Sequence, residues 1–173
     1  MLKTKKLSKM EYDQFKKKQF QWHLISLSIL RIAIGWHFLN EGLLKVMDPA
    51  WSGADFLNNA TGPFASLFKS IALNPALLGI TDFLNQWGLV LIGISLMLGL
   101  LSRWACVGGM FLLALYYFAN PPFIGHDGGS YTEGNYLIVN KNLIEFFALW
   151  VLFHFQSSKV FGMDRFFKAP KAE

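Results

Sequence analysis

Cysteine is almost absent from this 173-residue chain, which contains only Cys106. A single thiol excludes an intrachain disulfide, a Cys-x-x-Cys redox centre and a thiolate-rich metal site. The chain also lacks a glycine-rich nucleotide loop, a nucleophile elbow and a His-Glu-x-x-His helix. We therefore expect no bound metal, and any redox cofactor would be diffusible or held by a partner protein.

Histidine is scarce as well, and its placement argues against haem. A bis-histidine haem needs two imidazoles that face each other at one depth. His37 lies within a long apolar run and has no histidine at its depth, whereas His23 and His154 lie at the ends of such runs. We expect no haem in this protein.

Charged residues make up only 16% of the chain and hydrophobic residues 53%, with a mean hydropathy of +0.34. Long apolar segments separated by short polar ones are typical of a helical protein that crosses the membrane several times. The sequence therefore predicts an all-α fold, a bundle of four transmembrane helices over residues 22–47, 80–101, 104–119 and 137–155.

The connections between these helices differ in character. Apolar residues from Phe64 to Ile71 repeat at helical spacing, which predicts a short amphipathic helix over 63–73 in the first outer loop. Residues 120–136 are rich in proline and glycine and indicate a loop. The chain then divides into a basic tail, a transmembrane domain and an interfacial tail over residues 1–21, 22–156 and 157–173.

Lysine and arginine are unevenly distributed. Twelve of the sixteen lie in the two tails and at Arg103, and the two longer loops contain only Lys69. Because cytoplasmic segments carry an excess of these residues, both termini are expected in the cytoplasm and both longer loops outside. The basic tails indicate orientation rather than binding of nucleic acid. The first tail is either an amphipathic helix at the membrane surface or a solvated segment.

The first apolar run contains four ionisable residues, namely Arg31, His37, Glu41 and Lys45. At about 100° per residue, the last three fall on one stripe of a helix and Arg31 lies at its edge. Each such group costs roughly 2.5–3.5 kcal/mol in hydrocarbon even on the lenient insertion scale. These side chains are therefore expected to face partners rather than lipid.

The other predicted helices supply polar residues at a similar depth. Lys141 and Glu145 in the fourth helix repeat the arrangement of Lys45 and Glu41 in the first. The second and third helices contribute polar groups in the same half of the membrane, including Asn85, Tyr116 and Tyr117.

Two interpretations account for these residues. In one, Glu41–Lys45 and Lys141–Glu145 are pairs within single helices that neutralise one another and fix helix register. In the other, the residues line an outward-facing cavity for a small polar or redox ligand. We favour the cavity, because four contributing helices are more than helix register requires.

A cavity of this kind suits a quinone. Glu41, Glu145 and His37 are the candidate catalytic residues, since they can relay protons or bond a carbonyl oxygen. Trp36 and Trp150 lie too deep for an interfacial aromatic belt and could stack on a flat head group, although plain core packing also explains them. The candidate quinone-binding residues are Trp36, His37, Lys45, Asn85, Tyr116, Tyr117, Lys141 and Trp150.

Three short motifs can be compared with known families. They are RIAIGWHFLNEGLLKVMDP in residues 31–49, the glycines of GLVLIGISLMLGLLSR in 88–103, and GMDR in 162–165. Together they resemble the DoxX family, over roughly residues 24–167. The resemblance implies a four-helix bundle in a bacterial inner membrane. The family includes small subunits of thiosulfate:quinone oxidoreductase, and other members are described as membrane partners of oxidoreductases.

Three hypotheses of function follow. The first is a membrane subunit of an oxidoreductase that passes electrons between a periplasmic substrate or partner and membrane quinone. The second is a non-catalytic anchor or scaffold for a soluble partner enzyme. The third is a small-molecule carrier or isomerase built on a similar bundle. The expected partners are the lipid bilayer, an oxidoreductase subunit and a small ligand in the outer cavity, and a homo-oligomer is compatible with all three hypotheses.

Overall fold

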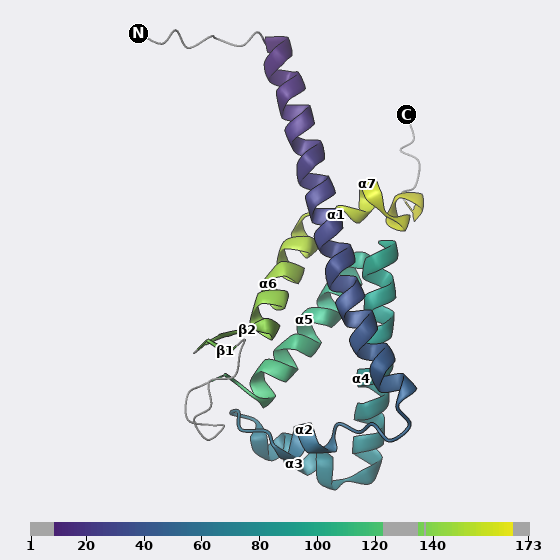
Figure 1. Ribbon diagram of the computed structural model, residues 1–173, viewed down its shortest axis with the longest axis vertical. Helices are drawn as coiled ribbons and strands as arrows, with labels where there is room; N and C mark the ends of the chain where they lie inside the picture. Colours follow the sequence, from purple (N-terminus) through teal and green to yellow (C-terminus); the bar gives the residue numbers. More distant parts are fainter. Residues whose placement is uncertain (1–8, 123–134, 137, 168–173) are drawn as a thin grey trace.

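The computed structural model describes residues 9–122, 135–136 and 138–167, which are mostly helical (Figure 1). Four long helices pack side by side: α1 (Lys9–Met47), α4 (Pro75–Leu98), α5 (Ser102–Ala119) and α6 (Lys141–His154). The shorter elements are α2 (Ala54–Asn58), α3 (Ala65–Leu73), the strands β1 (Asn135–Tyr136) and β2 (Val139–Asn140), α7 (Ser158–Phe161) and a 3-10 helix η1 (Met163–Phe167).

The short helix predicted over 63–73 is present as α3. The helix predicted over 80–101 instead spans Pro75–Leu98. It begins earlier because Asn74 accepts backbone hydrogen bonds as an N-cap and proline suits the first helical turn. It ends earlier because Gly99 adopts a left-handed conformation, with φ of 66°.

Two predicted boundaries differ from the structure. Helix α1 continues without a break through position 21, so the basic segment from Lys9 onward belongs to the same helix as the apolar run. The fourth helix begins at Lys141 rather than at 137, because residues 139–140 pair with residues 135–136 as a short antiparallel ladder. The side chain of Asn140 then caps the helix by accepting a hydrogen bond from the Leu143 amide.

Two helices are long and apolar enough to cross a membrane, Gln14–Met47 and Pro75–Leu98. Only 28% and 17% of the residues in their most apolar windows are buried. The core helix of a water-soluble protein would be mostly buried. Here large apolar side chains such as Ile29, Leu91 and Phe111 lie on the outer surface of the bundle, as expected where lipid replaces water.

Helices α1 and α4 form the closest helix pair. A Cβ atom added to Gly93 would lie 2.5 Å from the backbone nitrogen of Leu39, and one added to Gly42 would lie 2.7 Å from that of Val90. Gly35 makes a similar approach to Met97. Glycine at these positions lets two helix backbones touch, which is the usual means of helix association in a membrane.

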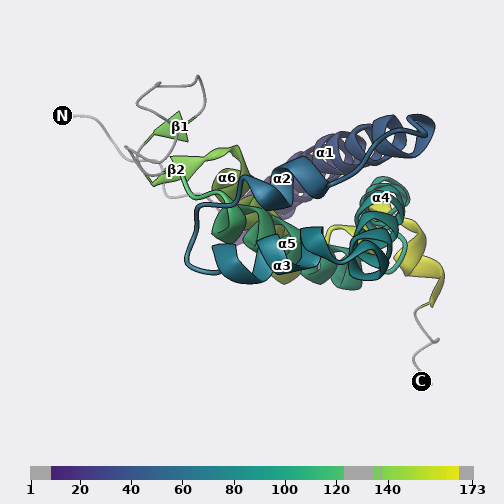
Figure 2. The same ribbon diagram turned by 90° about the horizontal axis from the view of Figure 1, so that it is seen from below.

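Two buried apolar clusters lie at different levels of the bundle. The larger one joins the four long helices and includes Phe38, Leu96 and Leu149. The smaller one includes Leu57 of α2 and Phe68 of α3. Seen from below, α2 and α3 lie across the end of the bundle (Figure 2). We refer to this end as the α3 end and to the opposite one as the α7 end.

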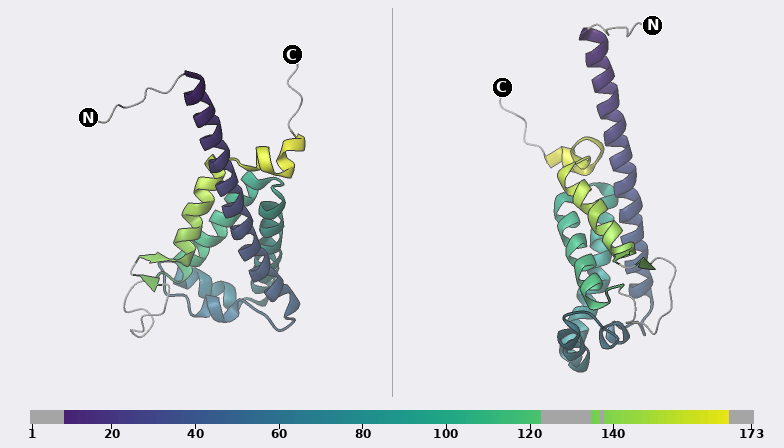
Figure 3. Two further views of the ribbon diagram at one scale, coloured as in Figure 1. Left: turned by 45° about the horizontal axis from the view of Figure 1, so that its top comes forward. Right: turned by 90° about the vertical axis from the view of Figure 1, so that its left-hand side faces the viewer.

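The α7 end is held together by contacts distant in sequence. Arg31 is almost fully buried and donates from Nη2 to the carbonyl oxygen of Phe161 at 2.7 Å. Asp164 accepts hydrogen bonds from the backbone nitrogens of Leu101 and Ser102. Its own backbone nitrogen donates to the Gly99 carbonyl. The turn between α4 and α5 and the segment α7–η1 therefore lie at one end, beyond which α1 extends (Figure 3).

Arg31 lies on α1 toward the α7 end, away from His37, Glu41 and Lys45, which line the cavity at the α3 end. It packs against Gly99 and Gly162, where a Cβ atom would lie 2.6 and 2.9 Å from Arg31 Nη1. The two glycines therefore leave room for a buried guanidinium.

Candidate functional site

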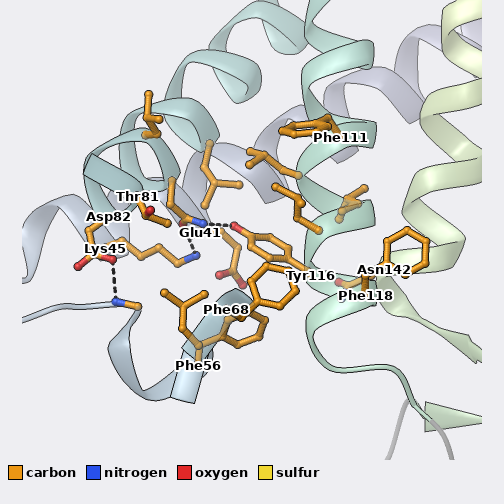
Figure 4. A pocket seen from close by; sticks show the side chains of 18 of the residues that line it. Glu41, Lys45, Phe56, Phe68, Thr81, Asp82, Phe111, Tyr116, Phe118 and Asn142 are labelled. Atoms are coloured by element: carbon orange, nitrogen blue, oxygen red, sulfur yellow. Dashed lines mark hydrogen bonds between the residues drawn. The ribbon is translucent and has the colours of Figure 1, made fainter. Parts of the chain in front are cut away.

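A cavity of about 840 Å³ lies at the α3 end, between the two buried clusters (Figure 4). All four long helices contribute to its wall, and α2 and α3 cover it. Seven of the residues that the sequence predicts for a cavity line this one: His37, Glu41, Lys45, Asn85, Tyr116, Lys141 and Glu145.

The charged groups in this cavity form pairs between helices. His37 Nε2 of α1 lies 3.5 Å from Glu145 Oε1 of α6, and Lys141 Nζ of α6 lies 3.7 Å from Glu41 Oε1 of α1. We expected such groups to pair, if at all, within one helix as Glu41–Lys45 and Lys141–Glu145. The observed ion pairs cross from one helix to the other, because α1 and α6 carry their charges at the same level and face each other.

Lys45 takes part in a different network. Its Nζ donates to Asn85 Oδ1 at 3.1 Å, and Asn85 Nδ2 donates to the Tyr116 hydroxyl oxygen at 2.6 Å. The ammonium also lies 5.2 Å from the centre of the Trp51 ring, within cation–π distance. Since the Tyr116 oxygen accepts from Asn85, its own proton is free to point toward the cavity.

The cover of the cavity is fixed by Asp82 of α4. This carboxylate accepts hydrogen bonds from Ser52 Oγ at 2.8 Å and from the Gly53 backbone nitrogen at 3.0 Å. It thereby holds the link between α1 and α2 against α4. The ring of Phe56 in α2 then packs edge-on against Tyr116, with ring centres 5.8 Å apart.

Sequence reasoning missed these covering residues. Trp51 and Phe56 lie in the predicted connection that follows the first helix. Phe64, Leu67 and Phe68 lie in the helix predicted over 63–73, for which the sequence predicts no part in the cavity. The available signal was the high aromatic content of residues 51–68, which is unusual for a solvent-exposed loop.

Three predicted site residues do not line the cavity. Trp36 and Trp150 are both more than half exposed and lie on the outer surface of the bundle. Trp36 is one residue before the inward-facing His37, so its side chain points about 100° away. Trp150 packs along its own helix against the His154 ring. Tyr117 donates its hydroxyl proton to the Ile138 carbonyl at 2.9 Å, outside the cavity. Neither tryptophan side chain therefore lies in this cavity or in the buried core.

No group of three or more histidine, cysteine, aspartate or glutamate side chains within residues 9–122 and 138–167 is arranged to hold a metal ion. The side chains that line the cavity offer three chemical groupings. These are a histidine beside a carboxylate, a second carboxylate beside an ammonium, and a hydroxyl whose oxygen is already engaged.

The apolar exterior and the two long candidate spans indicate a class, that of helical membrane proteins, and this chain adds a cavity lined by ionisable side chains. Within that class the chain belongs to the DoxX family, whose model matches residues 26–121. The match covers α1 from Ser26 through the end of α5, and so includes most of the cavity wall. Searches of curated proteins and of solved structures returned no similar chain.

Proposed function

We propose that this protein is a membrane subunit of an oxidoreductase system, in which electrons pass from a substrate or partner on the outer side to membrane quinone. The observation that carries the proposal is the convergence of His37, Glu41, Tyr116, Lys141 and Glu145 on one cavity within an otherwise apolar bundle. Ionisable groups at such depth are costly and mark functional sites in membrane proteins. Membership of the DoxX family agrees with this assignment.

The proposal includes the arrangement in the membrane. All four long helices would cross the bilayer, with both termini and the Gly99–Leu101 turn in the cytoplasm of a bacterial inner membrane. The basic residues of the two tails and Arg103 support this orientation by the positive-inside rule. At about 1.5 Å per residue, α5 and α6 span roughly 27 and 21 Å. Helix α5 is thus near the thickness of the hydrocarbon core, about 30 Å, whereas α6 is about 9 Å shorter, a mismatch that local thinning of the bilayer would accommodate.

The cavity fits a quinone head group on two counts. Its volume of about 840 Å³ lies within the usual 300–1,000 Å³ of small-molecule sites. Its polar residues include donors on opposite walls, Tyr116 on α5 and His37 on α1, which suit a ring with two carbonyl oxygens. A quinone, when bound, supplies a two-electron, two-proton acceptor.

The chain's own residues would then hold and move protons. His37 Nε2 and Glu145 Oε1 are 3.5 Å apart, so an approach of a few tenths of an ångström, or one bridging water, would let the pair share a proton and be recharged from the outer side. Lys141 lies 3.7 Å from Glu41 and would hold that side chain toward α6. Asn85 orients the Tyr116 hydroxyl as a donor.

The test is ligand identity combined with substitution. The protein is purified in mild detergent and extracted, and quinone is quantified by mass spectrometry per mole of protein. Wild type is expected to retain quinone, and the Glu41→Gln/Glu145→Gln double variant is expected to lose most of it. Asp55→Asn is the matched control, because this exposed carboxylate of α2 does not line the cavity. Equal retention by all three proteins, or none by any, would contradict the proposal.

A second candidate function is a scaffold for a partner protein. It is favoured by the exposed first part of α1, because residues 14–23 all present their side chains to the surroundings. On this interpretation the ion pairs between α1 and α6 act only as braces. The activity of the partner complex would then survive Glu41→Gln and Glu145→Gln but fail when residues 9–23 are deleted.

A further inference from the structure

The cavity is not enclosed on all sides by the bundle. Four apolar residues both line it and are more than half exposed, namely Phe64 at the start of α3, Leu67 of α3, Leu84 of α4 and Phe111 of α5. A side chain can meet both conditions only at the rim of an opening. The cavity therefore opens to the outer surface of the bundle between α4 and α5, beneath α3.

The course of α4 and α5 explains the opening. The helices are joined by the tight turn at Gly99–Leu101 and diverge toward α3 (Figure 1). Near the turn they are in contact, because a Cβ atom at Gly108 would lie 3.4 Å from Ile92 and one at Gly88 would lie 3.7 Å from Leu112. Beyond Gly88 the two helices are joined inside the cavity by the hydrogen bond from Asn85 to Tyr116, while the rim residues Leu84 and Phe111 stay exposed.

The depth of the opening matters for what can pass through it. At 1.5 Å rise per residue, Leu84 lies roughly 14 Å from the start of α4, and Phe111 roughly 12 Å from the end of α5. Both residues lie on helices whose exteriors are apolar. The opening therefore faces the hydrocarbon of the bilayer rather than the water beyond it.

The opposite side of the cavity has a different chemistry. His37, Glu41, Lys141 and Glu145 lie along the seam between α1 and α6, and Glu41 and Lys141 are themselves partly exposed there. The cavity thus has paired ionisable groups at the α1–α6 seam and apolar rim residues at the α4–α5 side, and its lining also includes the Lys45–Asn85–Tyr116 network. A ligand that satisfies both sides has a compact polar head and a hydrocarbon chain.

We propose that the opening bounded by Leu67, Leu84 and Phe111 is a lateral entrance from the bilayer, and that it holds the hydrocarbon chain of a lipid-soluble amphipathic ligand. The head of that ligand lies between Tyr116 and the His37–Glu145 pair. This inference rests on the proposed function, and it adds the direction of access and a site for the chain. A water-soluble ligand would instead reach the charged groups from the α3 end.

The test compares two probes with the same head group. Decylubiquinone carries a ten-carbon chain, and ubiquinone-0 has none. Binding of each to the purified full-length protein is measured by calorimetry in mild detergent. Leu84→Trp narrows the opening, and Leu91→Trp is its matched control. Leu91 lies two turns along the same face of α4, is equally exposed and does not line the cavity. Leu67→Trp and its control Leu73→Trp repeat the comparison on α3.

We expect wild type to bind decylubiquinone at least tenfold more tightly than ubiquinone-0. Leu84→Trp and Leu67→Trp should weaken decylubiquinone binding at least tenfold and leave ubiquinone-0 unchanged, while the two control variants change neither. Equal effects of each tryptophan and its control would overturn the lateral entrance. If both probes still bind and Glu145→Gln weakens the binding of both, the proposed function would stand without the lateral entrance. Failure of wild type to bind either probe would overturn both proposals.

Discussion

Removing the Asp164 carboxylate should destabilise the whole bundle, although this residue lies far from the cavity. Its two oxygens accept from Leu101 N at 2.7 Å, from Ser102 N at 3.3 Å and from Ser102 Oγ at 2.6 Å. Helix α5 has no capping side chain of its own, because its N-cap is Leu101. Asp164 therefore caps α5 from a distant part of the sequence and closes the turn against η1.

The magnitude follows from what Asp164→Ala removes. The backbone bond from Asp164 to Gly99 remains, and three hydrogen bonds to an ionised acceptor are lost. Loss of an N-cap costs about 0.5–2 kcal/mol, and hydrogen bonds to charged groups contribute about 1.5–3 kcal/mol each when buried. Because Asp164 is partly exposed, each bond contributes less than it would in a buried site, and we expect Asp164→Ala to lower the free energy of unfolding by about 3 kcal/mol. For a chain of this length that corresponds to a melting temperature lower by roughly 6–12 °C.

The effect should depend on pH in one direction. Burial raises the pKa of Asp164. Hydrogen bonds from Ser102, Ser158 and two backbone amides lower it by a larger amount, so the pKa lies below its ordinary value. A lowered pKa means that folding favours the ionised carboxylate. The stabilisation is therefore complete above the ordinary carboxyl pKa of about 3.9 and is lost as the pH falls through the lower folded value.

The assay is thermal unfolding in mild detergent, followed through the six tryptophans, with Asp55→Ala as an exposed control. The difference between wild type and Asp164→Ala should be constant between about pH 5 and 8 and should shrink below about pH 4. A melting temperature within about 1 °C of wild type at pH 7 would refute the reasoning. A difference that persists unchanged at pH 3 would refute the assignment to the carboxylate.

Three further predictions concern helix packing, backbone strain and the cavity. Gly93→Val should separate α1 from α4, because its Cβ atom would lie 2.5 Å from a backbone nitrogen of α1, and should cost about 1–3 kcal/mol in thermal unfolding. Gly79→Val, with open space around its Cβ, should cost much less. Leu101→Gly should raise the melting temperature by a few degrees, since Leu101 has φ of 48° and a left-handed conformation costs a non-glycine residue about 1–2 kcal/mol. Tyr116→Phe should reduce quinone retention measured by mass spectrometry, whereas Tyr117→Phe should leave it unchanged, and equal values for both would contradict the role of the directed hydroxyl.

The sequence is informative wherever a side chain must avoid lipid. The stripe of His37, Glu41 and Lys45 predicts an inward face of α1, and the cavity lies on that face. Matching depth also predicts that α6 contributes Lys141 and Glu145. In both cases the cost of exposing charge to hydrocarbon restricts the side chain to one direction.

The sequence is less informative where apolar residues have two acceptable surroundings. Trp36 and Trp150 can face either lipid or the core at similar cost, so depth alone does not decide between stacking on a ligand and contact with the bilayer. The sequence also does not decide which lysine pairs with Glu41, because Lys45 lies one turn along the same helix and Lys141 lies on α6. Only the relative rotation of the two helices selects Lys141.

The continuity of α1 has a mechanical consequence. From Gln14 to Gly35 the helix rises roughly 32 Å, and from Gly35 to Glu41 roughly 9 Å. Gly35, Leu39 and Gly42 all lie in tight contact with α4, so this part of α1 is held over about two turns while the segment from Gln14 extends beyond the bundle. A sideways force at Gln14 therefore acts on the α1–α4 contact through a long arm and loads Gly35 first. The tighter contacts at Leu39 and Gly42 keep Glu41 in place beside α6.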